Sequence, residues 1–225
     1  MRLFAVIPVL DEREAIAAAV RSAVEGPCGG VVVVDGGSRD GTAETARLAG
    51  AHVFVERCRG YGRAVMRGVS EARTLGAEAY VVFDGNGSVS RRDLEKVVAP
   101  LLEGRVDFCL GVRPPNRLRA MQRLGNRFAV EVLARRFGVR FADVGAVRAV
   151  TAEALDGLEL DELGYGWPLQ LQARVAARGL RTAQVPVDPL ARIGRSKVSG
   201  TARGRLGASV AFLRVLAREC SRGLA

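Results

Sequence analysis

The chain has 225 residues, of which 48% are hydrophobic and 26% charged, so it can bury a core and is not intrinsically disordered. No apolar run reaches the roughly 18 residues of a membrane-spanning helix, and the first residues lack the features of a signal peptide. The net charge is +10, and eleven Lys and Arg residues against two acids follow residue 173. We therefore expect a cytoplasmic protein with an anionic partner: phosphorylated substrates, an anionic membrane or nucleic acid.

The first 110 residues alternate short apolar runs with amphipathic segments. Strands are predicted at residues 3–7, 31–34, 51–55, 79–83 and 106–110, with helices between them. Asp11 and Glu14 form a pattern typical of a capping box before the first helix, and Ser90 is the expected N-cap of the fourth. Such alternation predicts an α/β fold with a mostly parallel sheet and helices on both faces.

The second half is less regular. Helices are predicted at residues 118–137, 169–177 and 206–219, and strands at residues 141–150 and 182–187. The strand at 141–150 would carry Asp143 and Arg148. No linker or repeat divides the chain, which favours one domain over residues 1–204 and an amphipathic helical extension over residues 205–225.

Polar residues follow three of the predicted strands, in segments 8–12, 35–40 and 84–88. Ligands of open α/β sheets bind at the carboxyl ends of the strands, so these segments are expected to form one site. The glycines after Asp35 allow close approach of backbone to a ligand, and the carboxylate can accept hydrogen bonds from a nucleoside. The alternative is a tight strand–helix turn capped by Ser38. A dinucleotide cofactor is not indicated, because no GxGxxG follows the first strand.

A carboxylate at a strand end can also hold a divalent cation beside phosphate oxygens. Asp84 with the amide oxygen of Asn86 is the candidate pair for Mg²⁺ or Mn²⁺. The alternative for this segment is a plain helix-entry turn.

Two further segments suit phosphate groups. Residues 192–201 contain Arg192, Arg195 and Lys197 among hydroxyls and glycines, a composition typical of a lid that grips a diphosphate. Gly60 and Gly62 open a predicted helix whose N-terminus can accept an anion. A solvated charged loop and an ordinary helix start are the alternatives.

Taken together and in this order, these segments resemble the family 2 glycosyltransferases, most closely the dolichol-phosphate mannose synthase-like branch. The resemblance spans residues 3–204 and includes Val6-Ile7-Pro8, Asp35-Gly36-Gly37-Ser38, Gly60-Tyr61-Gly62, Asp84-Gly85-Asn86-Gly87, Asp143-Val144-Gly145 and the segment from Arg192 to Thr201. It implies a GT-A-type, Rossmann-like fold, a nucleotide-sugar donor (UDP-, GDP- or dTDP-sugar), a divalent metal and inverting transfer.

The resemblance also assigns residues. The donor nucleotide would contact Pro8, Val9, Asp11, Glu12, Asp35, Gly37, Ser38, Gly60, Gly62, Asp84 and Gly85. Catalysis would fall to Asp84, Asp143, Arg148, Arg192, Arg195 and Lys197, with Asp143 as the base for an alcohol acceptor. The sequence departs from the family at Asn86, where a second Asp is usual, and at Gln170, where a Glu is usual. Loss of the second carboxylate predicts weaker metal binding.

The acceptor is left open between a polyprenyl phosphate and a small phosphorylated or hydroxylated molecule. An ionised phosphate needs no general base, which suits a chain with one histidine. The helix at 206–218 would lie on the inner face of an anionic membrane, pack on the domain or form a homodimer. A basic nucleic-acid-binding protein is disfavoured, because only 5% of residues are aromatic.

Overall fold

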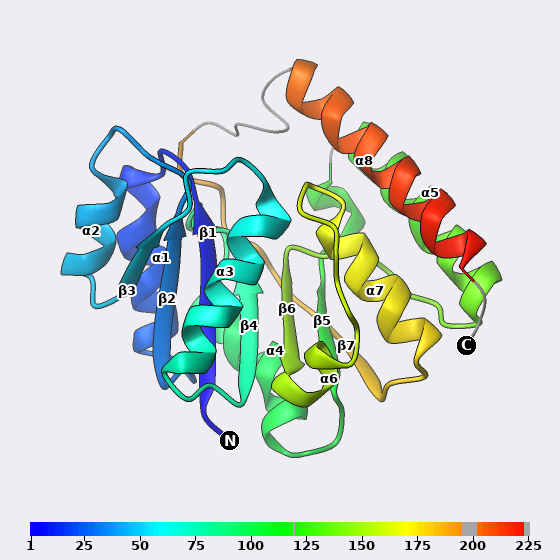
Figure 1. Cartoon of the computed structure of the whole chain (residues 1–225), viewed down its shortest axis with the longest axis horizontal. Helices are drawn as coiled ribbons and strands as arrows, with labels where there is room; N and C mark the ends of the chain where they lie inside the picture. The colour runs from blue at the N-terminus through cyan, green and yellow to red at the C-terminus, as the bar shows by residue number, and fades with distance from the viewer. Residues whose placement is uncertain (119, 195–201, 223–225) are drawn as a thin grey trace.

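The computed structural model describes residues 1–118, 120–194 and 202–222, with the backbone alone at residues 202–206 and 208. One sheet organises the chain (Figure 1). Its seven strands, in spatial order β3-β2-β1-β4-β6-β5-β7, are β1 (Leu3–Val9), β2 (Gly30–Asp35), β3 (His52–Val55), β4 (Ala79–Phe83), β5 (Phe108–Val112), β6 (Val147–Thr151) and β7 (Thr182–Pro186). The α-helices are α1 (Arg13–Val24), α2 (Thr42–Leu48), α3 (Tyr61–Thr74), α4 (Arg91–Leu102), α5 (Ala120–Phe137), α6 (Ala152–Asp156), α7 (Trp167–Ala177) and α8 (Ala202–Ser221).

The sheet is mostly parallel, as predicted. β1 pairs in parallel with β2 and β4, β2 with β3, and β5 with β7. β6 is the exception, because it runs antiparallel between β4 and β5. In this register Arg148 of β6 lies beside Val82 of β4, two residues before Asp84. A strand from late in the sequence thus brings Arg148 close to the carboxyl end of β4.

Alternate residues of the strands enter two separate cores, one on each face of the sheet. Phe4, Val6, Val32 and Val34 pack with α3, α7 and the buried halves of α5 and α8. Ala5, Ile7, Val31 and Val33 pack with α1, α2 and α4 on the opposite face. Strands that are apolar on both faces are what a covered parallel sheet requires.

Helices α5 and α8 lie side by side beyond α7, at the far end of the molecule from α2 (Figure 1). Their carboxyl ends are joined, because the Arg136 side chain donates hydrogen bonds to the carbonyl oxygens of Cys220 and Arg222. α8 is also fixed to α7 through the buried Glu219, which accepts hydrogen bonds from Gln170 and Arg174. Among the described residues, no helix has the length and apolarity that crossing a membrane requires.

Two local predictions were wrong. The strand expected at 141–150 begins only at Val147, because residues 141–146 form a loop that includes Gly145 at φ 73°. Asp11 does not cap α1: it has φ 49°, and its carboxylate accepts the N–H of Arg39 instead. The Ser90 cap is confirmed by its hydrogen bond from the Asp93 N–H.

Candidate functional site

A pocket of about 820 Å³ opens at the carboxyl ends of β1 and β4. Its walls divide into two sides. Pro8, Leu10, Gly36, Glu56 and Gly60 line the side next to β1 and β2. Residues of β6, α5, α7 and α8 and their loops line the other side. The pocket therefore lies where the strand-end rule predicted it, and the late part of the chain closes it.

Side chains at the end of β2 and in the loop after it accept hydrogen bonds from backbone N–H groups of that loop and of the loop after β1. One carboxylate oxygen of Asp35 accepts the N–H groups of Gly37 (2.8 Å) and Ser38 (2.6 Å), and the Ser38 hydroxyl accepts the N–H of Asp11 (2.8 Å). The second carboxylate oxygen of Asp35 is buried without a protein partner. A buried acceptor of this kind has capacity for a hydrogen-bond donor of a ligand.

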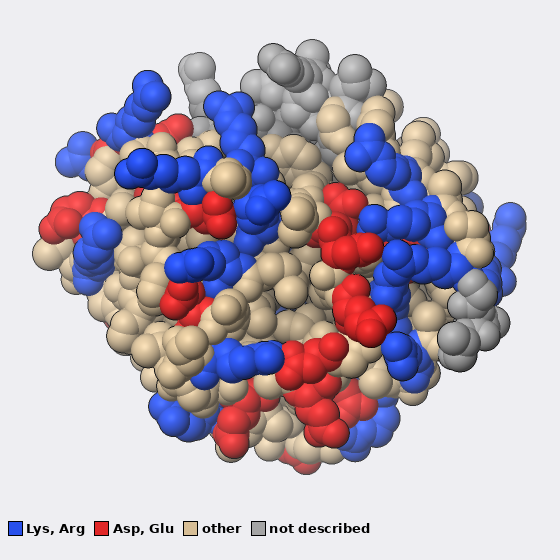
Figure 2. Space-filling model, viewed as in Figure 1, with Lys and Arg blue, Asp and Glu red and all other residues tan. Residues whose placement is uncertain are grey.

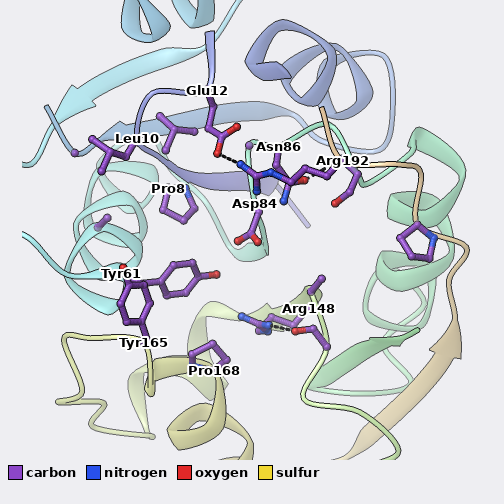
Figure 3. A pocket seen from close by; sticks show the side chains of 18 of the residues that line it. Pro8, Leu10, Glu12, Tyr61, Asp84, Asn86, Arg148, Tyr165, Pro168 and Arg192 are labelled. Carbon is purple, nitrogen blue, oxygen red and sulfur yellow. Dashed lines mark hydrogen bonds and ion pairs between the residues drawn. The ribbon is translucent and has the colours of Figure 1, made fainter. Parts of the chain in front are cut away.

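Asp84 follows the last residue of β4 and points into the centre of the pocket (Figure 3). Burial raises the pKa of its carboxyl, and the positive charges of Arg148, Arg113 and Arg192 oppose this rise. The Tyr61 hydroxyl faces the same space. Burial and the charge of Asp84 raise the pKa of the Tyr61 phenol, which therefore stays protonated and able to donate a hydrogen bond.

Arg148 faces Asp84 from the opposite wall (Figure 3). Its side chain is 1% exposed, and its Nη2 donates to the carbonyl oxygen of Gly145 at 2.7 Å. Its Nε and Nη1 are buried with no protein hydrogen-bond partner, and its guanidinium lies 5.9 Å from the centre of the Trp167 ring. Buried charged groups are normally fully hydrogen-bonded, so these two donors mark a place for an anion.

Arg192 lies above Asp84 and forms an ion pair with Glu12 (Figure 3). The chain on either side of it is held against the loop after β4. The N–H of Leu190 donates to the Ser88 carbonyl (2.9 Å), and the N–H of Ile193 donates to the Asn86 carbonyl (3.1 Å). Residues 190–193 are thus held against the loop that follows Asp84.

Asp143 is held behind the pocket wall by Arg113. The Nε and Nη2 of Arg113 donate to the two carboxylate oxygens at 2.8 and 2.9 Å, and its backbone N–H donates at 3.1 Å. Burial alone would raise the pKa of the Asp143 carboxyl, but these bonds and the charge of Arg113 lower it. An acid held ionised in this way is a weak proton acceptor, which disfavours the base role expected for an alcohol acceptor.

The structure brings together only part of the set proposed from the sequence. Nine members line the pocket: Pro8, Val9, Glu12, Gly60, Asp84, Gly85, Asn86, Arg148 and Arg192. Six are not among its lining residues: Asp11, Asp35, Gly37, Ser38, Gly62 and Asp143. Arg195 and Lys197 lie outside the described residues. Packing, rather than ligand binding, explains the glycine at position 62, because a Cβ there would lie 2.1 Å from the Glu162 carbonyl oxygen.

Several lining residues were missed. Arg113 directly follows β5, so the strand-end rule could have found it. Tyr61 lies between the two glycines already singled out. Glu56 directly follows β3, so the strand-end rule could also have found it. For Phe212 we find no signal in the sequence, since a helix remote along the chain brings it to the pocket.

The donor set suits a divalent cation only in part. Among the described residues, no group of three His, Cys, Asp or Glu side chains could hold a metal. Mg²⁺ at phosphate sites takes one or two protein carboxylates and completes its shell with phosphate and water, and Asp84 fits that role. The Asn86 amide oxygen accepts the Ser88 N–H at 3.0 Å and has one further lone pair.

Known proteins resemble this chain in sequence. An uncharacterized glycosyltransferase of Mycobacterium tuberculosis is 35% identical over 215 residues, which are 94% of this chain and 96% of that protein. Glycosyltransferase AglJ of Haloferax volcanii is 34% identical over 80% of this chain, and the match spans 60% of AglJ. The undecaprenyl-phosphate mannosyltransferase of Micrococcus luteus is 29% identical over 89% of this chain and 88% of its own length.

In structure, the chain resembles glucosyl-3-phosphoglycerate synthase of M. tuberculosis, solved with Mn²⁺, UDP and glucosyl-3-phosphoglycerate. The TM-score is 0.81 at 22% identity, over 99% of this chain and 81% of the other. This likeness confirms the GT-A-type fold expected from the sequence. The family model Glycosyl transferase family 2 matches residues 4–138. The chain therefore belongs to glycosyl transferase family 2 and is a glycosyltransferase.

Proposed function

We propose that the protein transfers a sugar, with inversion, from a nucleotide-diphosphate sugar to an acceptor that carries a phosphate. The observation that carries this proposal is Arg148. It is a buried guanidinium with two unpartnered donors, and it faces Asp84 across the pocket. Asp84 belongs to the donor side, so an anion at Arg148 is a second ligand beside the donor.

The donor would bind along β1, β2 and β4. Pro8, Leu10 and Gly36 line an apolar surface for the nucleoside. Asp35 does not line the pocket, but it directly precedes Gly36, and its second carboxylate oxygen would accept a hydrogen bond from the nucleoside. The diphosphate would then reach the loop after Asp84, between Arg192 and Tyr61. This order places the sugar's anomeric carbon toward Arg148.

In this scheme an acceptor phosphate oxygen attacks the anomeric carbon from the side opposite the diphosphate. The new C–O bond forms as the C–O bond to the nucleoside diphosphate breaks, and the leaving group carries the electron pair. The second pKa of a phosphate monoester is about 6, so the attacking oxygen is already ionised and no base is required. Arg148 would hold that phosphate in line, and placement of this kind contributes much of catalysis.

A divalent cation is part of the proposal. Asp84 would hold Mg²⁺ or Mn²⁺, with Asn86 as a second oxygen ligand, and the ion would neutralise charge that builds on the leaving diphosphate. The structural relative solved with Mn²⁺ and UDP supports this assignment. Arg192 would supply positive charge to the same oxygens, and Arg195 and Lys197 remain candidates for that role from the sequence.

We favour a polyprenyl phosphate as the acceptor, as in the branch that the sequence resembles. The undecaprenyl-phosphate mannosyltransferase of M. luteus supports this choice at 29% identity. The acceptor side of the pocket also contains the apolar side chains of Leu118, Leu190 and Phe212. A small acceptor such as phosphoglyceric acid is the second candidate, because a protein of the same fold is solved with it.

The proposal is tested by a donor panel followed by an acceptor panel. Thermal shift with UDP-, GDP- and dTDP-sugars, with and without Mn²⁺, identifies the donor, because a ligand bound at 100 times its Kd stabilises by about 2.7 kcal/mol. Transfer of labelled sugar is then measured to undecaprenyl phosphate, phosphoglyceric acid and a free polyprenol. We expect turnover with phosphate-bearing acceptors. Turnover with the alcohol alone would contradict the role given to Arg148.

A further inference from the structure

A group of exposed apolar side chains lies on the first half of α5 and near the middle of α8. We name it the interfacial surface, and its described members are Met121, Leu124 and Phe128 of α5 and Val210 and Leu213 of α8. Their exposed fractions are 78%, 66%, 53%, 46% and 57%. Single exposed apolar residues are ordinary, but five large ones on two adjacent helices mark an interaction surface.

The spacing of these residues gives each helix one exposed apolar stripe. Met121, Leu124 and Phe128 are three and four residues apart, and Val210 and Leu213 are three apart, so each set lies on one helix face. Other residues of the same helices are buried, namely Ala129 and Leu133 in α5 and Val215 and Leu216 in α8. Packing on the domain therefore accounts for these residues and not for the exposed stripes.

The charge around the interfacial surface is mainly positive. Glu131, one turn beyond Phe128, forms ion pairs with Arg135 and Arg140. Arg123 and Arg127 of α5 and Arg214 of α8 are exposed beside it. The sequence has no acid between residues 120 and 130 or between residues 202 and 218. Figure 2 shows basic side chains along α8. Apolar residues flanked mainly by arginines are the composition of helices that lie in an anionic membrane interface.

The interfacial surface borders the mouth of the pocket. Leu118, two residues before α5, and Gln122 of α5 line the pocket, and so does Phe212 of α8, next to Leu213. A ligand that leaves the acceptor side therefore passes directly beside the exposed stripe. The side chains of Tyr165 and Leu190 continue the apolar rim, with 41% and 56% exposed.

We propose that this surface docks on an anionic phospholipid bilayer and presents the acceptor side of the pocket to it. The apolar stripes would enter the boundary between headgroups and acyl chains, while Arg123, Arg127 and Arg214 contact lipid phosphates. A second copy of the chain is a poorer occupant, because it would bring like charges together. The inference deepens the proposed function, since it makes a lipid-borne phosphate the acceptor and places it beside Arg148.

Vesicle flotation tests the docking without any assay of transfer. The full chain is mixed with vesicles of phosphatidylcholine alone and with 30 mol% phosphatidylglycerol added, at about 0.1 M salt. We expect binding to the anionic vesicles and at least about tenfold weaker partitioning for the double variant Leu124→Asp and Leu213→Asp. The triple variant Arg123→Gln, Arg127→Gln and Arg214→Gln should also bind less and lose most of its dependence on phosphatidylglycerol.

The matched control is Leu48→Asp on α2, because Leu48 is 81% exposed at the opposite end of the molecule (Figure 1). It should float like the original chain. Unchanged binding of the double variant would overturn the proposal, as would a dimer in light scattering that the same double variant dissociates. The thermal shift with nucleotide sugar is measured on each variant and should be unchanged. If the double variant loses vesicle binding but keeps donor binding, the surface acts in docking alone. If the original chain binds no donor, the proposed function is contradicted and the docking result still stands.

Discussion

Among the positive charges that oppose the rise in the pKa of Asp84, the charge of Arg148 has the largest effect. The two side chains face each other across the pocket. Burial disfavours the charge of Asp84, and Nε and Nη1 of the buried Arg148 guanidinium have no protein hydrogen-bond partner. Such a pair lowers the stability of the ligand-free protein. Its unmet interactions are made when an anion binds Arg148 and a cation binds Asp84. The site is therefore expected to gain stability from its ligands.

Replacing Arg148 with Met should affect both stability and function. The substitution removes the main positive charge that faces Asp84 and the hydrogen bond to the Gly145 carbonyl, so the free energy of unfolding should fall by about 3 kcal/mol. The rate of sugar transfer should fall by about 10²-fold or more, because the acceptor phosphate loses the guanidinium that holds it. Urea unfolding and steady-state kinetics measure the two effects. Arg73→Met, at an exposed ion pair with Asp156, serves as the control and should alter neither by much. A variant that unfolds more easily and transfers normally would assign Arg148 to the core alone.

The raised pKa of Asp84 predicts a stability change with pH that Asp84→Asn abolishes. The folded pKa lies above the unfolded value, so the folded state binds the proton more tightly. The ligand-free protein should then lose stability as the pH rises from about 4 through the folded pKa of Asp84. We would measure the melting temperatures of the original protein and of Asp84→Asn from about pH 4 to 7. The difference between the two at each pH isolates this contribution. A difference that does not vary with pH would contradict the raised pKa. Added Mn²⁺ and donor should stabilise the original protein more at the higher pH.

The Asp143–Arg113 pair should be structural, with the opposite dependence on pH. Asp143→Asn leaves Arg113 partly buried without its counter-ion and should cost about 3 kcal/mol. Because the pKa of Asp143 is lowered, its contribution is present above the ordinary carboxyl range and is lost as the pH falls through the folded pKa. Urea unfolding at neutral pH measures the cost. Asp107→Asn is the matched control: it breaks a similar two-bond pair with Arg181, whose side chain is 61% exposed, and should cost at most about 1 kcal/mol.

Gly62→Ala tests the contact between α3 and the loop that carries Tyr165. The new Cβ would meet the Glu162 carbonyl oxygen at 2.1 Å and the Trp167 Cβ at 2.9 Å. We expect destabilisation of about 1–3 kcal/mol and weaker donor binding, since Tyr61 is displaced with the helix start. Gly125→Ala in α5 is the control, because nothing lies within 4 Å of its Cβ, and it should stabilise by about 0.5 kcal/mol. Equal thermal shifts for the two variants would show that the Gly62 contact is not tight.

The strands and the position of the pocket were predictable because they depend on local patterns. Four consecutive valines and polar residues after Asp35 and Asp84 identify buried strands and their functional ends. The order of the strands is not encoded locally, so the placement of β6 beside β4 was not foreseen. Arg113 directly follows β5 and could have been found by the strand-end rule, but its pairing with Asp143, 30 positions away, has no local signal. The Asp11 capping prediction failed because Ser38 and Arg39, from another loop, bind its backbone and side chain.

The antiparallel insertion of β6 has a consequence for the choice of acceptor. The family match ends at residue 138, before the side chains of Arg148, Tyr165 and Phe212. The part that the family model matches thus carries the loops after β1, β2 and β4 that we assign to the activated sugar, whereas the rest supplies Arg192 and the wall opposite. Changes confined to that wall would alter the molecule that is glycosylated and leave the three loops in place.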